Sequence, residues 1–406
     1  QLAIMLVASA VFTALAVQAA GPDLAGQITA RFAENPGVGP SAKQILALGP
    51  GSAYGATSGL VAVFGLQWLL QRNADGTGYL AQRAMACRSD ADARRAAAVF
   101  SLLQIVLRSL LWVPLGLALL LLLPDDPALA GDARILARER SFVTGMAELL
   151  PAGLLGLMLT GMLAALASTI DSHLNWGASY WASDLYQRFL VRGILRREPS
   201  ARSVVWVARG TNALLLTLAL GIMTQLDSVQ SAWKATLVLG AGMGPAMVLR
   251  WLWWRMTAWG ELASIAVSAC FAPLAILALD GEALQMLLTA GLSTAACVGV
   301  SCWTGPEPRD VLVAFYQRAR PPGWWGPVAR EANRPADESL RALRRALFQT
   351  ACAAVSLFAA LLGGLLPAVG GSWLTAAGCL GVACVAALGW WPALADDAPA
   401  GAGGSR

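Results

Sequence analysis

Charge is absent from long stretches of this chain, and this constrains its fold more than any other feature. Residues 346–395 contain no charged side chain, and of the 406 residues only 13% are charged while 57% are hydrophobic. A soluble globular domain carries about 25% charged residues, and about 20 consecutive apolar residues cross the hydrocarbon core of a bilayer as a helix. The chain is therefore predicted to be an all-α polytopic membrane protein.

The apolar runs predict about ten transmembrane helices. Pro and Gly in LLPAVGGSW mark a turn that divides the last run into two spans. The predicted spans are 1–21, one within 56–84, 96–123, 153–175, 204–224, 232–252, 259–279, 284–304 and two in 346–395.

Basic residues gather in every second loop. Arginines cluster after the second, fourth and eighth spans, within 83–95, 188–202 and 309–345. The loops between carry Asp227 and then Asp280 with Glu282, although the loop 124–148 is mixed in charge. By the positive-inside rule, the arginine-rich loops face the cytoplasm.

The chain begins at Gln1, without a methionine or a basic segment, and enters its first apolar run at once. A signal peptide has a charged start, so this run is predicted to be a spanning helix. The sequence is expected to be a fragment that lacks its N-terminal part.

The span at 153–175 holds the densest group of polar residues at membrane depth. Residues three and four apart share a helix face, so the carbonyl of Ala165 and the hydroxyls of Ser168 and Thr169 converge. Such oxygens suit a small hard cation such as sodium, and polar groups at this depth indicate function. Asp171 and Ser172 follow on the next turn. Two alternatives stay open: the hydroxyls bond to carbonyls one turn earlier or join helices, and Asp171 caps a neighbouring helix.

The second predicted span is interrupted by QWLLQRNADGTGY at 67–79. Asn73, Asp75 and Thr77 lie there, and they predict a helix that unwinds and exposes its backbone to a substrate. The alternative is a span that ends early in a loop.

The third span contains Gln104 and Arg108, four residues apart and hence on one face. Arg108 is a candidate for pairing with Asp75 or for bidentate binding of a substrate carboxylate. A structural ion pair or a snorkelling side chain is the alternative.

The sixth span contains Gly240, Gly242, Gly244 and Pro245, which permit close helix packing or a hinge. The tryptophans in 251–254 are predicted to form an interface belt rather than a ligand cage.

Three stretches are in register with one family of membrane transporters. GYLAQRAMACRS at 78–89 is similar to the end of its sixth core helix, and AALASTIDS at 164–172 to its eighth, which has a sodium-binding Ser-Ser or Ser-Thr pair. DSVQSAWKATLVLGAGMGPAMVLRWLWWR at 227–255 is similar to its tenth. On these motifs the chain resembles the sodium:solute symporter family, which includes sodium-coupled sugar, proline and sialic-acid carriers.

The resemblance implies a leucine-transporter-type inverted-repeat fold. Residues 1–22 would be the fifth core helix, 56–252 the second five-helix repeat, 259–395 peripheral C-terminal helices and 396–406 a short cytoplasmic tail. The first four core helices would be missing and are expected in the same or a companion chain. Because the first core helix of the family supplies further sodium ligands, weak or absent sodium affinity is expected for the chain as given.

The resemblance also implies which residues form the sites. Sodium would be held by Ala165, Ser168 and Thr169, with a possible second sodium at Asp171 and Ser172. An aspartate stands at this second site where the family has a hydroxyl.

The leading hypothesis is a secondary active transporter that couples sodium entry to uptake of a small polar solute (sugar, amino acid or carboxylate) across the bacterial inner (plasma) membrane. The solute would lie against Asn73–Thr77 and the Gln104 and Arg108 face. The alternatives are a non-transporting sensor or regulatory module and a degenerate transporter fragment. An enzyme is not expected, because no span pairs a nucleophile with a base or gathers metal ligands.

Overall fold

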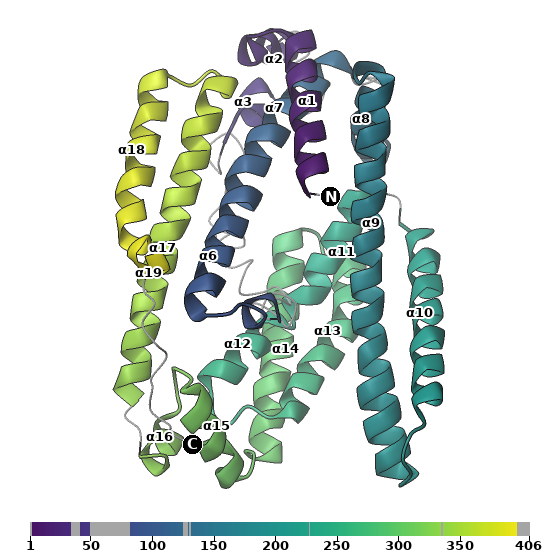
Figure 1. Ribbon diagram of the computed structural model, residues 1–406, viewed down its shortest axis with the longest axis vertical. Helices are drawn as coiled ribbons and strands as arrows, with labels where there is room; N and C mark the ends of the chain where they lie inside the picture. The colour runs from purple at the N-terminus through teal and green to yellow at the C-terminus, as the bar shows by residue number, and fades with distance from the viewer. Residues whose placement is uncertain are drawn as a thin grey trace. The chain divides into compact units, whose positions relative to one another are not determined.

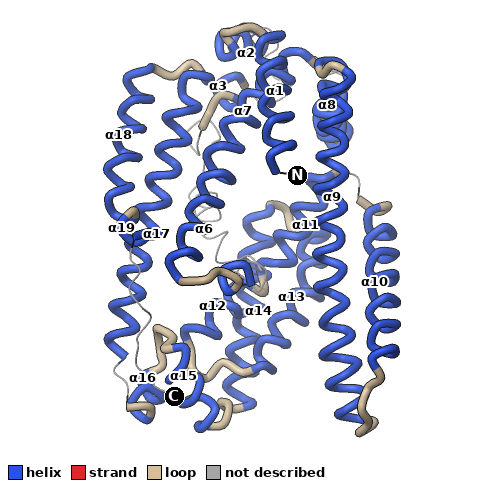
Figure 2. Tube along the Cα trace, viewed as in Figure 1, coloured by secondary structure: helices blue, strands red, loops and turns tan. Residues whose placement is uncertain are grey.

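The computed structural model describes residues 2–33, 41–48, 82–124, 129, 131–226, 228–333 and 336–395. These residues are mainly helical and contain no strand (Figure 2), apart from one isolated bridge between Trp253 and Trp324. The prediction of an all-α chain is confirmed for this part.

The helices follow the apolar runs closely. Among the described residues, nine helices are long and apolar enough to cross a membrane, and they correspond to nine of the ten predicted spans. Most of the remaining span, within 56–84, lies outside the described residues. The chain is an integral multi-pass membrane protein. The described elements up to residue 223 are α1 (Leu2–Ala20), α2 (Leu24–Ala33), α3 (Ala42–Ile45), α6 (Asp90–Ser101), η2 (Leu102–Leu107), α7 (Arg108–Leu122), α8 (Gly131–Leu149), α9 (Ala152–Ser179), η3 (Tyr180–Ile194) and α10 (Ala201–Met223).

The other elements continue the same pattern of helices joined by short connections. They are α11 (Val229–Ala241), α12 (Gly244–Leu252), α13 (Ala258–Ala278), α14 (Glu282–Thr304), α15 (Arg309–Ala319), α16 (Gly326–Glu331), α17 (Ala336–Leu365), η4 (Leu366–Val369), α18 (Trp373–Trp390) and α19 (Pro392–Ala395). The predicted turn in LLPAVGGSW is confirmed: η4 is followed by its C-cap Gly370, whose φ of 80° is in the left-handed region that favours glycine.

The helix that contains the fourth span extends well beyond the predicted span 153–175. The helix does not end at residue 175, since α9 runs without interruption into the π-helix η3 and forms one 43-residue helix (Figure 1). At 1.5 Å per residue this is about 64 Å, roughly twice the 30 Å of the hydrocarbon core. Hydrophobicity falls along 152–194, but no proline interrupts this segment, so the helix continues.

The chain forms two compact units. The first contains residues 1–22 and 114–232, and in it α1 packs against α8 and α9, while α10 packs against α9 and η3. Phe12 is fully buried, with its ring 5.6 Å from that of Phe142 in an edge-on arrangement. A Cβ atom on Gly161 would lie 2.7 Å from the Met5 sulfur, so the small residue lets α9 approach α1 closely.

Helix α8 occupies the loop that the sequence marks only as mixed in charge. The carboxylate of Glu139 accepts hydrogen bonds from the backbone N–H groups of Val229 and Gln230, each at 3.0 Å. These are orphan donors of the first turn of α11, where a negative charge is favourable. Glu139 therefore caps α11 from a distant part of the sequence.

The second unit contains residues 23–113 and 233–406, and its largest elements are two helical hairpins, α13 with α14 and α17 with α18. Small residues permit the close approach within α17 and α18. A Cβ atom on Gly363 would lie 2.7 Å from Leu380, and one on Gly389 would lie 2.5 Å from the Cys352 sulfur.

The predicted sixth span is broken at residues 242–243 into α11 and α12. The Met243 N–H donates to the Gly240 carbonyl rather than one residue further back, and Pro245 has no N–H to donate. Serines of α13 take over the freed acceptors: Ser268 Oγ donates to the Leu239 carbonyl at 2.6 Å, and Ser264 Oγ to that of Gly242 at 2.7 Å. Side-chain hydroxyls thus satisfy backbone groups that the break releases in a membrane-spanning helix.

Gly242 is also a point of very close packing. A Cβ atom there would lie 2.4 Å from Ser293 Oγ and 2.5 Å from Ser268 Oγ, and both serines are fully buried. The predicted close packing of the glycine-rich segment is therefore present together with a break in the helix, and its role as a hinge stays a prediction.

Candidate cation and substrate sites

The predicted sodium residues lie on two successive turns of α9. The helix begins after Pro151, whose fixed backbone suits a helix start, and no proline interrupts it at the site. Ala165 is half-buried, while Ser168, Thr169, Asp171 and Ser172 are exposed.

Two of the three predicted sodium oxygens are adjacent. Thr169 Oγ1 donates a hydrogen bond to the Ala165 carbonyl at 2.9 Å. Hard cations of calcium's size take oxygen ligands at roughly 2.3–2.6 Å, so one ion can contact both oxygens at this separation. The third oxygen, Ser168 Oγ, has no hydrogen-bond partner among the described residues, so both of its lone pairs are available.

The alternative interpretation, in which hydroxyls bond to carbonyls one turn earlier, holds for part of the group. It applies to Thr169 and to Ser172, whose hydroxyl donates to the Ser168 carbonyl at 2.8 Å. Such a bond uses the hydroxyl proton and leaves oxygen lone pairs for a cation. Back-bonding and cation binding are therefore compatible here.

Asp171 bonds within its own helix rather than to the end of a neighbouring one. Its Oδ1 accepts a hydrogen bond from Asn175 Nδ2 at 2.8 Å, and His173 Nδ1 lies 2.8 Å from the Thr169 carbonyl, to which it donates. Asn175 and His173 were not singled out from the sequence. Their signal was the spacing of four residues from Asp171 and Thr169.

The candidate substrate residues Gln104 and Arg108 lie in the second unit. Gln104 is in the π-helix η2, and the Arg108 N–H donates to the Leu103 carbonyl, five residues earlier. Single π-helical turns are frequent at functional sites. Both side chains are exposed, and the described residues offer the Arg108 guanidinium neither an ion pair nor a hydrogen bond.

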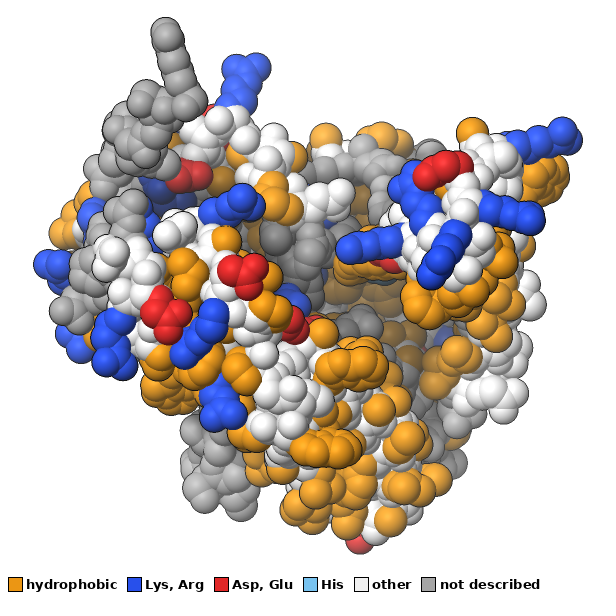
Figure 3. Space-filling view, turned by 90° about the horizontal axis from the view of Figure 1, so that it is seen from below, with side chains coloured by type: hydrophobic (Ala, Val, Ile, Leu, Met, Phe, Trp, Pro, Cys, Tyr) orange, Lys and Arg blue, Asp and Glu red, His pale blue; other side chains and the backbone are white. Residues whose placement is uncertain are grey.

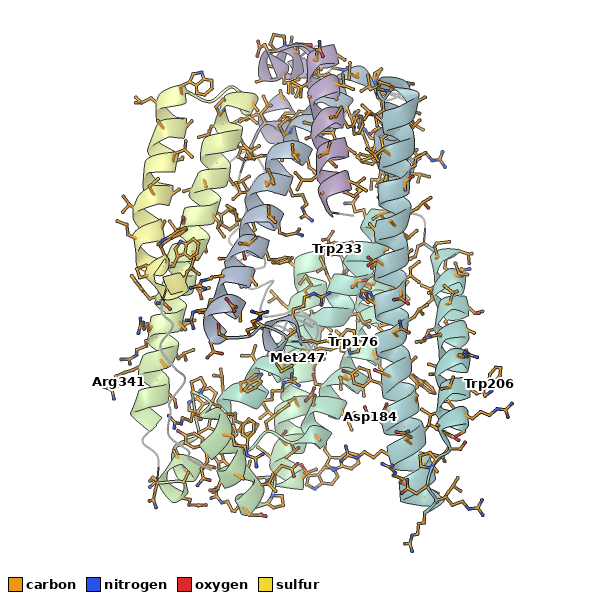
Figure 4. The ribbon with its side chains drawn as sticks, viewed as in Figure 1. Trp176, Asp184, Trp206, Trp233, Met247 and Arg341 are labelled. Atoms are coloured by element: carbon orange, nitrogen blue, oxygen red, sulfur yellow. The ribbon has the colours of Figure 1, made fainter. Side chains whose placement is uncertain are left out.

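The other substrate candidates, Asn73, Asp75 and Thr77, lie outside the described residues, so pairing of Arg108 with Asp75 stays a prediction. Figure 4 shows the long helix of α9 and η3, with Trp176 and Asp184 labelled in the part beyond the cation residues. The predicted tryptophan belt at 251–254 is only partly exposed, because Trp325 Nε1 donates to the Trp251 carbonyl at 2.7 Å and α15 and α16 pack against this segment.

Comparison with known proteins identifies relatives that are transporters. The sodium/proline symporter of Escherichia coli is 32% identical over 150 residues, which cover 36% of this chain and 28% of the relative. The osmoregulated proline transporter OpuE of Bacillus subtilis is 34% identical over 119 residues, 28% of this chain and 23% of the relative. The sodium/proline symporter of Haemophilus influenzae is 27% identical over 200 residues, 47% of this chain and 38% of the relative.

The chain thus matches between 23% and 38% of the length of these curated relatives. No solved structure matches it. A sequence model of the sodium:solute symporter family matches residues 1–267 of the 406. Because this match covers more than half of the chain, the chain belongs to the sodium:solute symporter family, a family of transporters rather than enzymes.

Proposed function

We propose that this chain is part of a secondary active transporter that couples sodium entry to the uptake of a small polar solute. The observation that carries the proposal is the oxygen group of α9. Its Ala165 carbonyl and Thr169 hydroxyl are 2.9 Å apart, and its Ser168 hydroxyl has no hydrogen-bond partner in the described part of the chain. Membership of the sodium:solute symporter family supports sodium as the coupled ion. The remaining sodium ligands come from another segment of the transporter.

Asp171 and Ser172 are proposed as a second, weaker cation position. Asp171 has one carboxylate oxygen bonded to Asn175, and its other oxygen has no hydrogen-bond partner among the described residues. A carboxylate at this point attracts a cation along α9 from the first position.

We propose that the solute is an amino acid of the proline class. Relatives named as proline transporters support this assignment. The guanidinium of Arg108 suits a carboxylate, which it can bind bidentately, with Gln104 and the segment Asn73–Thr77 completing the pocket. Since the relatives are bacterial, the inner membrane is the proposed location.

The proposed architecture is an inverted repeat. Residues 1–22 are its fifth core helix, 56–252 the second repeat, 259–395 peripheral helices and 396–406 a cytoplasmic tail. In this arrangement α9 is the eighth core helix.

Sodium dependence of proline uptake tests the cation site. The double substitution Ser168→Ala with Thr169→Ala removes two of the three oxygens proposed to bind sodium. In cells that express the full-length protein, it is expected to raise the sodium concentration for half-maximal uptake at least about tenfold, equivalent to about 1.4 kcal/mol. Thr160→Ala is the matched control, because Thr160 Oγ1 donates to the Gly156 carbonyl at 2.8 Å in the same back-bonded geometry.

Unchanged sodium dependence in the double variant, with normal expression, would show that these oxygens do not bind the coupled ion. An equal loss in Thr160→Ala would show a general effect on the helix. For the solute, Arg108→Gln is expected to raise KM for proline more than Arg108→Lys, and equal KM values in wild type and Arg108→Gln would remove Arg108 from the pocket.

A further inference from the structure

Four exposed tryptophans of the second unit lie at one end of its spanning helices. The linker between α12 and α13 and the end of α14 meet at this end, and the loop before α16 joins them, since the Trp324 N–H donates to the Leu252 carbonyl at 2.6 Å. Tryptophan is enriched where a membrane meets water, so the four indoles mark the level of the lipid head groups. They are Trp251 (42% exposed), Trp259 (65%), Trp303 (88%) and Trp324 (65%).

The charges at the two ends of the α13 and α14 hairpin differ. The turn between these helices carries Asp280 and Glu282, whereas the end with the tryptophans continues into the arginine-rich segment 309–345. The positive-inside rule places the tryptophan end at the cytoplasmic surface. Figure 3 views the molecule from below relative to Figure 1 and shows basic side chains among exposed apolar ones.

Helices α15 and α16 are fixed to the end of α12. Backbone and side-chain donors of the loop before α16 reach the last carbonyls of α12: Trp324 N–H bonds to Leu252 and Trp325 Nε1 to Trp251. Tyr316, Trp325 and Val328 are almost fully buried in this contact. The position of α15 relative to α12 is therefore well defined.

Two guanidinium groups each lie close to one indole in this contact. The Cζ atom of Arg309 lies 4.6 Å from the centre of the Trp254 ring, and that of Arg255 lies 5.9 Å from it. Arg309 also faces the carboxylate of Glu331 at 3.5 Å. Arg255 has no acidic partner in the described part of the chain, and its Nε is buried without a hydrogen bond.

A buried donor without a partner is costly, more so when it is charged. The terminal N–H groups of Arg255 are not among these buried atoms, and no described residue accepts a hydrogen bond from them, so they can reach a ligand with anionic oxygens. Phosphate matches the fork of N–H donors on a guanidinium, and at the level of the tryptophans the abundant phosphates are those of membrane lipids. The inner surface of a membrane is negatively charged and attracts such arginines.

We propose that Arg255 and Arg309 bind the phosphate of an anionic phospholipid at the cytoplasmic surface, beside Trp254. The lipid seals the junction of α12 with α15 against the bilayer. This site is independent of the cation and solute sites.

Lipid retention tests the proposal. The purified chain in detergent is titrated with phosphatidylglycerol, and native mass spectrometry counts the lipids that stay bound. Arg255→Gln and Arg309→Gln are each expected to weaken retention of the tightest lipid about fivefold, the equivalent of about 1 kcal/mol per basic residue. Arg255→Lys, which keeps the charge but loses the fork, is expected to fall between.

Arg341→Gln is the matched control, since Arg341 is exposed on α17 (Figure 4) and the change in charge is the same. An equal loss in Arg341→Gln would indicate diffuse attraction and overturn the site, as would unchanged retention in both Arg255→Gln and Arg309→Gln. Displacement of the lipid by an equal concentration of inorganic phosphate would assign the site to free phosphate instead. Thermal melting of each variant identifies any that is misfolded, and the other arginine then carries the test.

Discussion

The contact around Gly242 makes a sharp prediction about stability. Substitution of Gly242 by alanine introduces a methyl group 2.4 Å from Ser293 Oγ and 2.5 Å from Ser268 Oγ, in a place where no atoms can yield freely because both serines are fully buried. If Ser268 turns away, the Leu239 carbonyl loses the hydroxyl that it accepts from at 2.6 Å.

The magnitude follows from three contributions. Overpacking of a tight core costs about 1–3 kcal/mol, and loss of the Ser268 hydrogen bond adds about 1 kcal/mol. The unfolded chain has less conformational entropy with alanine than with glycine, which offsets about 0.4–1 kcal/mol of this loss. Gly242→Ala is therefore expected to lower the free energy of unfolding by roughly 1–3.5 kcal/mol.

Ser293 provides a direct test of this cause. Its hydroxyl is buried and has no hydrogen-bond partner among the residues that the structure describes, so Ser293→Ala alone is expected to be neutral or slightly stabilising. In the double variant Gly242→Ala with Ser293→Ala, the closest clash is gone. Part of the lost unfolding free energy is therefore expected to be recovered, and a double-mutant cycle measures the coupling between positions 242 and 293.

Thermal unfolding of the purified protein in detergent, followed by the fluorescence of its 16 tryptophans, ranks these variants. Gly291→Ala in α14 is the matched control, because nothing lies within 4 Å of a Cβ atom there, and it is expected to melt no lower than wild type. The packing argument is refuted if Gly242→Ala melts as high as Gly291→Ala, or if Ser293→Ala brings no recovery.

Two further contacts predict stability changes. Glu139→Gln removes the charge that caps α11 and is expected to cost about 1–2 kcal/mol of unfolding free energy in the same assay. Glu148→Gln, a change at an exposed residue of α8, should leave the unfolding free energy unchanged. Equal melting temperatures of the two variants would exclude the cap. The double variant Arg94→Gln with Arg95→Gln removes the donors to the Ala393 and Leu394 carbonyls of α19, at 2.7 Å and 2.9 Å. Proteolysis near residue 395 should therefore become faster, and an unchanged cleavage rate would show that the two arginines do not anchor α19.

Hydropathy located the spans well because crossing a bilayer is a local property of about 20 residues. The same locality explains the turn at Pro367 and Gly370 and the convergence of Ala165 with Thr169, which depend on neighbours within one helical turn. The family assignment also came from short motifs and is confirmed by a match over residues 1–267.

Contacts between distant residues were not predictable in this way. The cap that Glu139 places on α11 joins residues about 90 positions apart, and the serines that satisfy the broken span come from the next helix. Nor did the pattern show that α9 continues into η3, since falling hydrophobicity ends a membrane span without ending a helix.

The amino-acid sequence by itself determined that this protein is helical, membrane-embedded and a sodium:solute symporter relative, because hydrophobicity and short motifs are local properties of the sequence. Only the tertiary structure decided which hydroxyls have no hydrogen-bond partner among the described residues, as at Ser168 and Ser293, and which arginine has no acidic partner there, as at Arg255. Hydrogen-bond satisfaction depends on what the fold brings within about 3 Å, and spacing along the chain does not specify that.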